Sequence, residues 1–249
     1  MIKSWIPNGL SLGNLTFGFL SILVVSHANT TSRYEPHEVF FLGSIFILIA
    51  ALFDGLDGPL ARKLSAESAI GEQLDSLADL TTFGLAPGFL MYHVYFSAFN
   101  ISFKGYDYPI GMAVSAIYPM CAAYRLARFN VSHDPKTFLG LPSPIAGIFI
   151  ALIPLICQNY KMPLWSTVSI FLIISLLMVS NIRYSKPTRG LTSKITIYRL
   201  ITAVILISFL ILWLGWYWVV FSIIVLYIFS GFLAFFLLLI QKIRIGSNH

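Results

Sequence analysis

Eight long apolar segments separated by short polar breaks constrain the fold more than any other feature of this sequence. The segments cover residues 8–27, 38–62, 71–100, 108–129, 141–159, 163–182, 195–213 and 216–240. A helix rises about 1.5 Å per residue, so about 20 apolar residues cross the roughly 30 Å hydrocarbon layer of a bilayer. Inside that layer a single segment satisfies its backbone hydrogen bonds only as a helix. We therefore predict an all-α, polytopic membrane helix bundle with about eight transmembrane helices.

The composition favours a membrane location and argues against two other classes of protein. Hydrophobic residues make up 57% of the chain, charged residues only 10%, and the mean hydropathy is +0.82, which excludes an ordinary soluble globule. The net charge of +6 is also found in nucleic-acid-binding proteins. Such proteins gather their bases on one solvated surface, whereas here Lys and Arg occupy the breaks between apolar segments. We expect membrane lipids and phosphate substrates as partners, and no nucleic acid.

The basic residues are divided unequally between alternate breaks. If both termini are cytoplasmic, thirteen Lys and Arg residues lie on the cytoplasmic side, and only Arg33, Lys104 and Lys161 lie on the other. The thirteen are Lys3, Arg62, Lys63, Arg125, Arg128, Lys136, Arg183, Lys186, Arg189, Lys194, Arg199, Lys242 and Arg244. This asymmetry follows the positive-inside rule. It predicts cytoplasmic termini, and it places the polar ends of the second and third helices at the cytoplasmic face.

The start of the chain has features of a secretory signal peptide, because a basic residue precedes an apolar run and Ser26 and Ala28 are small. Pro7 and Asn8 interrupt this charged start, and the run is longer than most signal sequences. We interpret it as the first membrane helix. Since no linker, low-complexity tract or repeat divides the chain, we expect one domain over residues 1–249.

Four aspartates interrupt the apolar pattern where the second segment ends and the third begins. Asp54 and Asp57 are three positions apart, and Asp75 and Asp79 are four apart, so each pair shares one face of its helix. A short loop around residues 65–69 joins the two helices as a hairpin, which allows the four carboxylates to converge. Aspartate in a membrane helix is costly and rare. Four of them at facing positions indicate a functional site.

These carboxylates need a neutralising partner, because they would otherwise repel one another. Salt bridges with Arg62 and Lys63 are one alternative, but two bases cannot balance four acids. A hard divalent cation prefers carboxylate oxygens, so we predict Mg²⁺ or Mn²⁺ at this cluster, with enough carboxylates for two ions. Gly58, Ala61 and Gly71 leave the nearby surface bare, which lets a nucleotide or phosphate approach the backbone.

The whole pattern reads Asp54-x2-Asp57-Gly58-x2-Ala61-Arg62-x8-Gly71-x3-Asp75-x3-Asp79. It resembles the CDP-alcohol phosphatidyltransferase family at all eight defining positions. The resemblance implies a reaction in which an alcohol displaces CMP from a CDP-linked lipid with the help of a divalent metal. It implies metal binding by Asp54, Asp57, Asp75 and Asp79, with Asp79 also the general base. It implies a nucleotide pocket formed by Asp54, Gly58, Ala61, Arg62 and Gly71.

Four further segments resemble the phosphatidylserine synthase branch of this family, namely residues 6–14, 82–87, 124–130 and 140–144. This likeness implies CDP-diacylglycerol and L-serine as substrates, a cytoplasm-facing site in a bacterial or archaeal cell membrane, and a homodimer, which is common in the family. Gly84 and Pro87 predict a local loosening of the third helix, either to form an acceptor cavity or as a packing kink. A zwitterionic acceptor needs a cation for its carboxylate. The candidates for binding the acceptor or a lipid phosphate are Asn14, Arg125, Arg128 and Asn130.

Alternatives to these assignments are open at the level of sequence. Arg125 and Arg128 also fit lipid headgroups or the positive-inside rule, and Asn14 also fits a hydrogen bond to a neighbouring helix. The acidic pattern alone suits inositol, glycerol phosphate or an archaeal-type lipid as well. A cation-coupled transporter can also carry intramembrane aspartates. Such transporters usually repeat their charged half, whereas Asp107 and Asp134 are isolated here.

Overall fold

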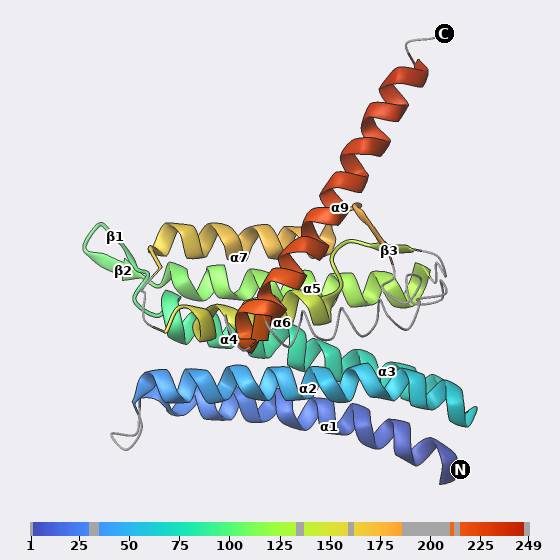
Figure 1. Ribbon diagram of the computed structural model, residues 1–249. Coiled ribbons are helices and arrows are strands. Elements are labelled where there is room, and N and C mark those ends of the chain that lie inside the picture. The colour runs from blue at the N-terminus through green and yellow to red at the C-terminus, as the bar shows by residue number, and fades with distance from the viewer. Residues whose placement is uncertain are drawn as a thin grey trace.

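The computed structural model describes residues 2–29, 35–132, 137–158, 162–185, 210–211 and 215–246 of the chain. Most of these residues are helical, as predicted. Figure 1 shows α1 (Ile2–Ser26) and α2 (Pro36–Leu64) side by side along one edge of the bundle. Both the N-terminus and the turn that follows α2 lie at the same end of the bundle (Figure 1).

The turn between α2 and α3 (Ala69–Asp79) is short and is formed by its own residues. α2 ends at Ser65, which has a left-handed backbone (φ 50°) and whose N–H donates to the Arg62 carbonyl at 3.1 Å. Ser68 then caps α3 by accepting a hydrogen bond from the Gly71 N–H at 3.1 Å. These caps satisfy backbone groups that both helix ends leave open. α1 packs against both helices and thereby holds the hairpin.

The third apolar segment is one continuous helical stretch with two π-helical parts. It consists of α3, η2 (Leu80–Leu85), α4 (Ala86–Met91) and η3 (Tyr92–Phe96), of which η2 and η3 are π-helical. The loosening predicted near Gly84 therefore exists. It is closely packed, since a Cβ on Gly18 would lie 2.8 Å from the Thr82 Cα, and one on Gly147 would lie 3.0 Å from the Phe83 Cα. Gly18 of α1 and Gly147 of α6 therefore let both helices pack closely against η2.

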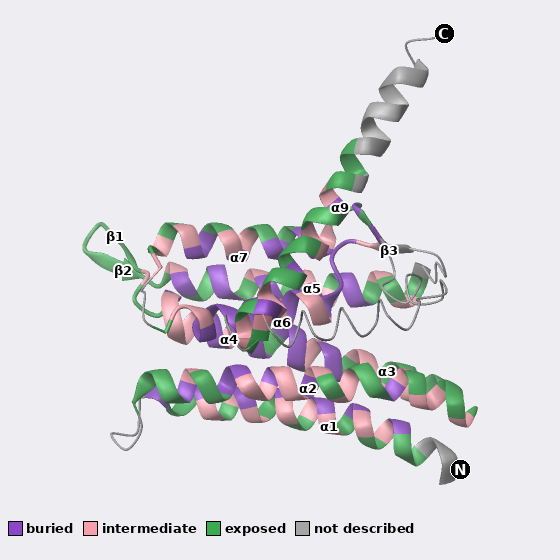
Figure 2. Cartoon of the chain, viewed as in Figure 1, coloured by how far each residue is buried: buried purple, intermediate pink, exposed green. Residues whose placement is uncertain are grey.

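The second half of the described chain forms the larger part of the core. Its helices are α5 (Ile110–Ser132), α6 (Ser143–Ile156) and α7 (Leu164–Val179). Figure 2 shows buried residues concentrated where these helices and α4 face one another. The Phe171 ring stacks on Tyr118 at 5.1 Å and meets Phe96 edge-on at 5.2 Å. Cys121 and Cys157 are free thiols that pack against this core.

Two small antiparallel sheets and a long helix complete the described structure. β1 (Ile101–Phe103) pairs with β2 (Tyr106–Tyr108), and β3 (Thr137–Leu139) pairs with β4 (Arg183–Ser185). The all-α prediction omitted both sheets, because strands of three residues are too short to show an alternating pattern. α9 (Trp216–Gly246) begins after Gly215, whose φ is +87°, and extends away from the bundle (Figure 1).

Four of the described helices are long and apolar enough to cross a membrane. These stretches are Trp5–Ser26, Pro36–Leu64, Ile110–Val131 and Trp216–Leu233. α6 and α7 are also apolar but shorter. Nearly all of the predicted helix 195–213 lies outside the described residues. The helices are thus compatible with a membrane protein, and the number eight stays a prediction.

Candidate active site

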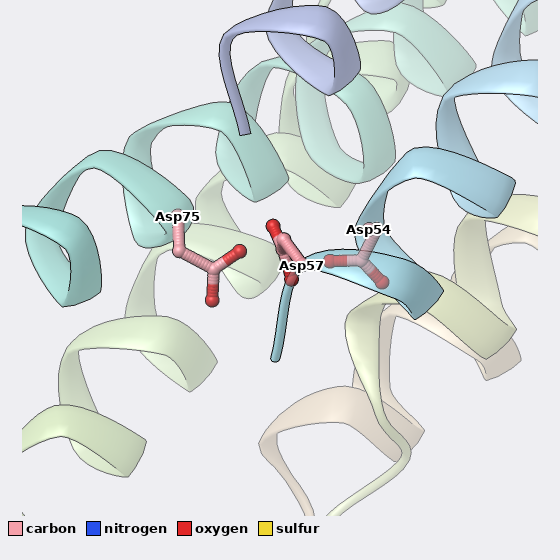
Figure 3. A group of neighbouring side chains, drawn as sticks. All are labelled: Asp54, Asp57 and Asp75. Carbon is pink, nitrogen blue, oxygen red and sulfur yellow. The ribbon is translucent and has the colours of Figure 1, made fainter. Parts of the chain in front are cut away.

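Three aspartates from α2 and α3 come together at the end of the bundle that carries the α2–α3 turn. Asp54, Asp57 and Asp75 each contribute one carboxylate oxygen to a group whose members all lie within 4.8 Å of one another. Figure 3 shows Asp75 on α3 approaching Asp57 and Asp54 on α2. We call these three residues the acidic trio. Asp57 is buried, and the other two are partly buried.

The acidic trio fits a divalent metal ion in both chemistry and size. Carboxylate oxygens are the preferred ligands of Mg²⁺ and Mn²⁺, and opposite ligands of an ion bound at about 2.0–2.6 Å are about 4–5 Å apart. The Asp75 Oδ1 atom is buried and has no hydrogen-bond partner among the described residues. Such an atom usually binds water or an ion. Ser11 Oγ donates to Asp57 Oδ2 at 2.9 Å and orients that carboxylate.

Asp79 lies outside the acidic trio, one helical turn after Asp75, and is only 7% exposed. Its carboxyl group is within interaction range of Asp54 and Arg125. Asn14 Nδ2 donates to Asp79 Oδ1 at 3.4 Å. The Asn14 Oδ1 atom is buried and accepts no hydrogen bond from any described residue. Asp79 therefore lies beside the trio and next to Asn14, whose Oδ1 atom can accept a hydrogen bond from a ligand.

A polar cavity of about 530 Å³ opens beside the acidic trio, between α1, the end of α2 and the start of α3. Its lining includes every predicted nucleotide contact except Asp54, namely Gly58, Ala61, Arg62 and Gly71. A Cβ on Gly58 would meet only the Arg62 guanidinium at 3.5 Å, so this glycine faces open space. A Cβ on Gly71 would lie 3.0 Å from Asn8 Oδ1, so this glycine permits the close approach of α1.

The first helix supplies three polar residues to the site. Asn8 and Ser11 line the cavity, and Asn14 contacts Asp79. Only Asn14 was among the predicted site residues. These residues recur at every third position, which places them along one face of α1. That polar stripe through an apolar helix was the sequence signal for the two residues that were missed.

Arg125 on α5 is buried (6% exposed) close to the carboxylates. Its guanidinium donates to Ser143 Oγ at 2.6 Å and lies 5.5 Å from the Phe129 ring centre. It also interacts electrostatically with Asp79 and Asp54. Ser143 belongs to the segment 140–144 and Arg125 to the segment 124–130. The structure thus joins two motifs that are separate in the sequence.

Arg128 occupies a different environment one turn further along α5. Its guanidinium donates to the backbone carbonyls of Leu139, Met178, Val179 and Ser180 at 2.8–3.4 Å, and to Asn181 Oδ1 at 3.4 Å. Three of these carbonyls lie at the end of α7, where a positive charge also complements the helix dipole. Gly140 has a φ of +78°, and a Cβ there would lie 2.9 Å from the Arg128 guanidinium. Arg128 thus ties α5 to the end of α7.

Asn130, the last predicted acceptor residue, contacts α3. Its Nδ2 donates to Ser76 Oγ at 3.0 Å, and Ser76 directly follows Asp75 of the acidic trio. The contact therefore holds the end of α5 against the second half of α3, beside the acidic residues.

A helical, membrane-compatible bundle that gathers carboxylates beside a polar cavity is the arrangement of a membrane enzyme that acts on phosphate-bearing substrates. The family comparison identifies which one. The model of the CDP-alcohol phosphatidyltransferase family matches residues 4–182, and the chain belongs to this family. Divalent-metal dependence is general in the family, in agreement with the acidic trio.

Curated relatives extend the comparison. A CDP-diacylglycerol–serine O-phosphatidyltransferase from Helicobacter pylori (strain J99) is 34% identical over 186 residues, covering 72% of this chain and 70% of the relative. The Bacillus subtilis protein of the same name is 34% identical over 151 residues, covering 60% of this chain and 75% of its own length. An archaetidylserine synthase from Methanothermobacter thermautotrophicus is 32% identical over 187 residues, covering 73% and 70% respectively.

Proposed function

We propose that this protein transfers the phosphatidyl group of CDP-diacylglycerol to L-serine and releases CMP. The observation that carries the proposal is the acidic trio beside a cavity lined by small residues and Arg62. The names of the relatives from Helicobacter pylori and Bacillus subtilis specify this reaction for those proteins. This chain is 34% identical to each of them and belongs to the CDP-alcohol phosphatidyltransferase family.

In the proposed reaction the cavity holds the cytidine diphosphate part of the lipid. Gly58 and Ala61 leave room for it, and Arg62 donates to a phosphate through its planar guanidinium. The acidic trio, with Asp79 beside it, would hold Mg²⁺ or Mn²⁺, and the four carboxylates carry enough charge for two ions. When bound, the metal neutralises the pyrophosphate and stabilises the departing CMP.

Asp79 is the proposed general base. It accepts the proton of the serine hydroxyl while that oxygen attacks the phosphatidyl phosphorus in line. The bond from this phosphorus to the oxygen of CMP breaks, and CMP leaves with that oxygen. Asn14 holds one oxygen of Asp79, which keeps the other oriented for proton transfer.

For the acceptor, Arg125 is the favoured partner of the serine carboxylate. It is buried beside Asp79, and among the described residues its guanidinium donates one hydrogen bond, to Ser143. A guanidinium carries five N–H donors, so others can serve a ligand. Arg128 and Asn130 are proposed to shape the acceptor pocket by holding α5 against α7 and α3. This assignment differs from the prediction that Arg128 and Asn130 bind the acceptor themselves.

The test is transfer by the purified protein in lipid vesicles. CDP-diacylglycerol is supplied with radiolabelled serine, inositol or glycerol phosphate in separate reactions, each with Mg²⁺, with Mn²⁺ or with EDTA. We expect a labelled lipid and stoichiometric CMP only with serine and metal. Labelled lipid from inositol or glycerol phosphate alone would leave the family chemistry intact and overturn the acceptor.

The archaeal relative supports a second candidate, the same transfer with an ether-linked archaeal lipid. The cavity is proposed to hold the cytidine diphosphate part, which both lipids share, so its lining suits either one. Reactions with CDP-archaeol and CDP-diacylglycerol at equal concentration distinguish them by the ratio of kcat/KM.

We also propose eight membrane crossings, cytoplasmic termini, a cytoplasm-facing active site, a single domain and a homodimer. The unequal distribution of basic residues supports the orientation. Reporter fusions at both termini test it, and a periplasmic signal from either terminus would contradict it. Mass measurement of the protein in detergent tests the dimer.

A further inference from the structure

The short hairpin of β1 and β2 lies far from the candidate active site. It joins the end of η3, at Phe96, to the start of α5, at Ile110. Figure 1 shows the hairpin projecting from the end of the bundle opposite the α2–α3 turn. The hairpin therefore connects two consecutive apolar helices. If these helices cross the membrane, the hairpin lies at a membrane boundary.

The strand register gives the hairpin two chemically different faces. Ile101 pairs with Tyr108 and Phe103 with Tyr106. Side chains alternate along a strand, so these four residues project from one face. The middle pair, Ser102 and Asp107, projects from the other face, where Ser102 Oγ donates to Asp107 Oδ1 at 2.5 Å. A single hairpin thus carries an aromatic, apolar face and a polar face.

The apolar face is open in the part of the chain that the structure describes. The exposed fractions are 49% for Ile101, 60% for Phe103, 71% for Tyr106 and 47% for Tyr108. Figure 2 shows the whole hairpin as exposed. At the tip, the exposed Lys104 lies over the Phe103 ring at 5.5 Å. Four exposed apolar side chains on one small face call for a partner.

We propose that this face rests in the lipid headgroup region at the end of the bundle opposite the candidate active site. Tyrosine and phenylalanine rings favour that region, because their rings bury in the acyl boundary while tyrosine hydroxyls reach water. Lys104 at the tip complements anionic headgroups. The Ser102 and Asp107 face turns to water. An isolated two-stranded hairpin is marginally stable in water, so lipid contact also stabilises it.

The same placement sets the depth of the catalytic residues. From Ile110 to Arg125 α5 rises about 22 Å, at 1.5 Å per residue. If Ile110 marks one edge of a hydrocarbon layer of about 30 Å, Arg125 lies about 8 Å inside the opposite edge for an upright helix. The hairpin thus acts as a stop that keeps the acidic trio near the other interface, within reach of both lipid and water-soluble substrate. This depth role rests on the proposed function, whereas the lipid contact does not.

The test uses nitroxide labels on single cysteines in the full-length protein. In a background with Cys121→Ala and Cys157→Ala, labels are placed on the apolar face (Phe103→Cys, Tyr106→Cys) and the polar face (Ser102→Cys, Asp107→Cys). The protein is reconstituted in vesicles of phosphatidylethanolamine and phosphatidylglycerol. Collision rates with oxygen, which concentrates in lipid, and with a neutral nickel chelate, which stays in water, are measured by electron paramagnetic resonance.

We expect the ratio of oxygen to nickel collision rates to be several-fold higher for labels on the apolar face, at positions 103 and 106, than for labels on the polar face, at positions 102 and 107. Equal, nickel-accessible labels on both faces would show a hairpin in water and overturn the proposal. Low collision rates with both reagents at 103 and 106 would show cover by protein and overturn it too. If Phe103→Cys or Tyr106→Cys fails to fold, Ile101→Cys and Tyr108→Cys test the same face. The outcome does not depend on catalysis, so it is separable from the proposed reaction.

Discussion

The candidate active site has two walls that use polar residues in different ways. On the α2–α3 wall, the acidic trio and Asp79 lie close together, and Asp75 Oδ1 has no partner among the described residues. On the α5 wall, Arg128 is engaged by four backbone carbonyls and one amide oxygen. A buried polar group without a partner costs free energy unless a ligand supplies one. The α2–α3 wall is therefore suited to bind a ligand, whereas the α5 wall holds the neighbouring helices in place.

Arg125 and Arg128 show the same contrast within one helix. They are three residues apart and carry the same charge, but Arg125 faces the carboxylates while Arg128 faces the end of α7. Their positions in the sequence are equally suggestive of phosphate or carboxylate binding. What separates them is the number of fixed acceptors that the fold brings to each guanidinium.

The strongest effect is expected at the proposed base. Asp79→Asn keeps the shape of the side chain but cannot accept the proton, so serine transfer should fall by about 10²–10⁴-fold. Binding of CDP-diacylglycerol, measured by calorimetry with metal present, should change little. If nucleotide binding falls as much as in Asp57→Asn, the division between base and metal ligands is wrong.

A bulky residue at Gly58 should come next. Gly58→Leu fills the space that faces the cavity, so the KM for CDP-diacylglycerol should rise by tenfold or more, which is about 1.4 kcal/mol of lost binding. Gly55→Leu is the matched control, because Gly55 lies one turn earlier on α2 and also faces open space, but it does not line the cavity. Comparable KM values in the two variants would place the nucleotide elsewhere.

The metal ligands are tested by Asp57→Asn. Loss of one carboxylate charge from the acidic trio should raise the Mn²⁺ concentration for half-maximal activity by about 10–100-fold. Ser11→Ala removes only the hydrogen bond that orients Asp57, so its shift should be in the same direction and smaller. A larger shift for Ser11→Ala than for Asp57→Asn would argue against a metal at the trio.

The α5 wall should respond through stability. Arg128→Leu removes hydrogen bonds from several partly buried carbonyls, at a cost of about 3 kcal/mol. The midpoint of thermal unfolding in detergent should drop by several degrees, while the KM for serine of the remaining folded protein rises only slightly, because Arg128 shapes the pocket without contacting the acceptor. A large rise in the KM for serine with an unchanged unfolding midpoint would show that Arg128 binds the acceptor. The two walls would then both bind ligands, and the contrast between them would be wrong.

The smallest effect is expected at Ser143. Ser143→Ala removes one hydrogen bond from Arg125, worth about 1 kcal/mol, so the KM for serine should rise by about fivefold with little change in kcat. Ser115→Ala is the control, because Ser115 is a buried serine on α5 whose hydroxyl, among the described residues, donates to the Gly111 carbonyl of its own helix. An equal response in both variants would mean that Arg125 does not depend on Ser143.

Several features could be read from the sequence because they follow from local spacing. The aspartate pairs share helical faces at three- and four-residue intervals. Between the two helices, the Ser65 backbone N–H and the Ser68 side chain form the caps that close the hairpin. Four of the five predicted nucleotide residues, Gly58, Ala61, Arg62 and Gly71, accordingly line one cavity. The strands were missed because three residues carry too little pattern, and β3 and β4 lie more than 40 positions apart in the chain.

By itself, the sequence determined the helical, membrane-compatible class, the acidic cluster and the family, because apolar length and residue spacing act within single helices. Only the tertiary structure decided which α1 residues enter the site, that Asp79 lies beside the trio rather than within it, and that Arg125 and Arg128 have different surroundings. These outcomes depend on which helix packs on which. The packing is set by contacts such as Gly18 on Thr82 and Gly140 on Met178, between residues distant in sequence.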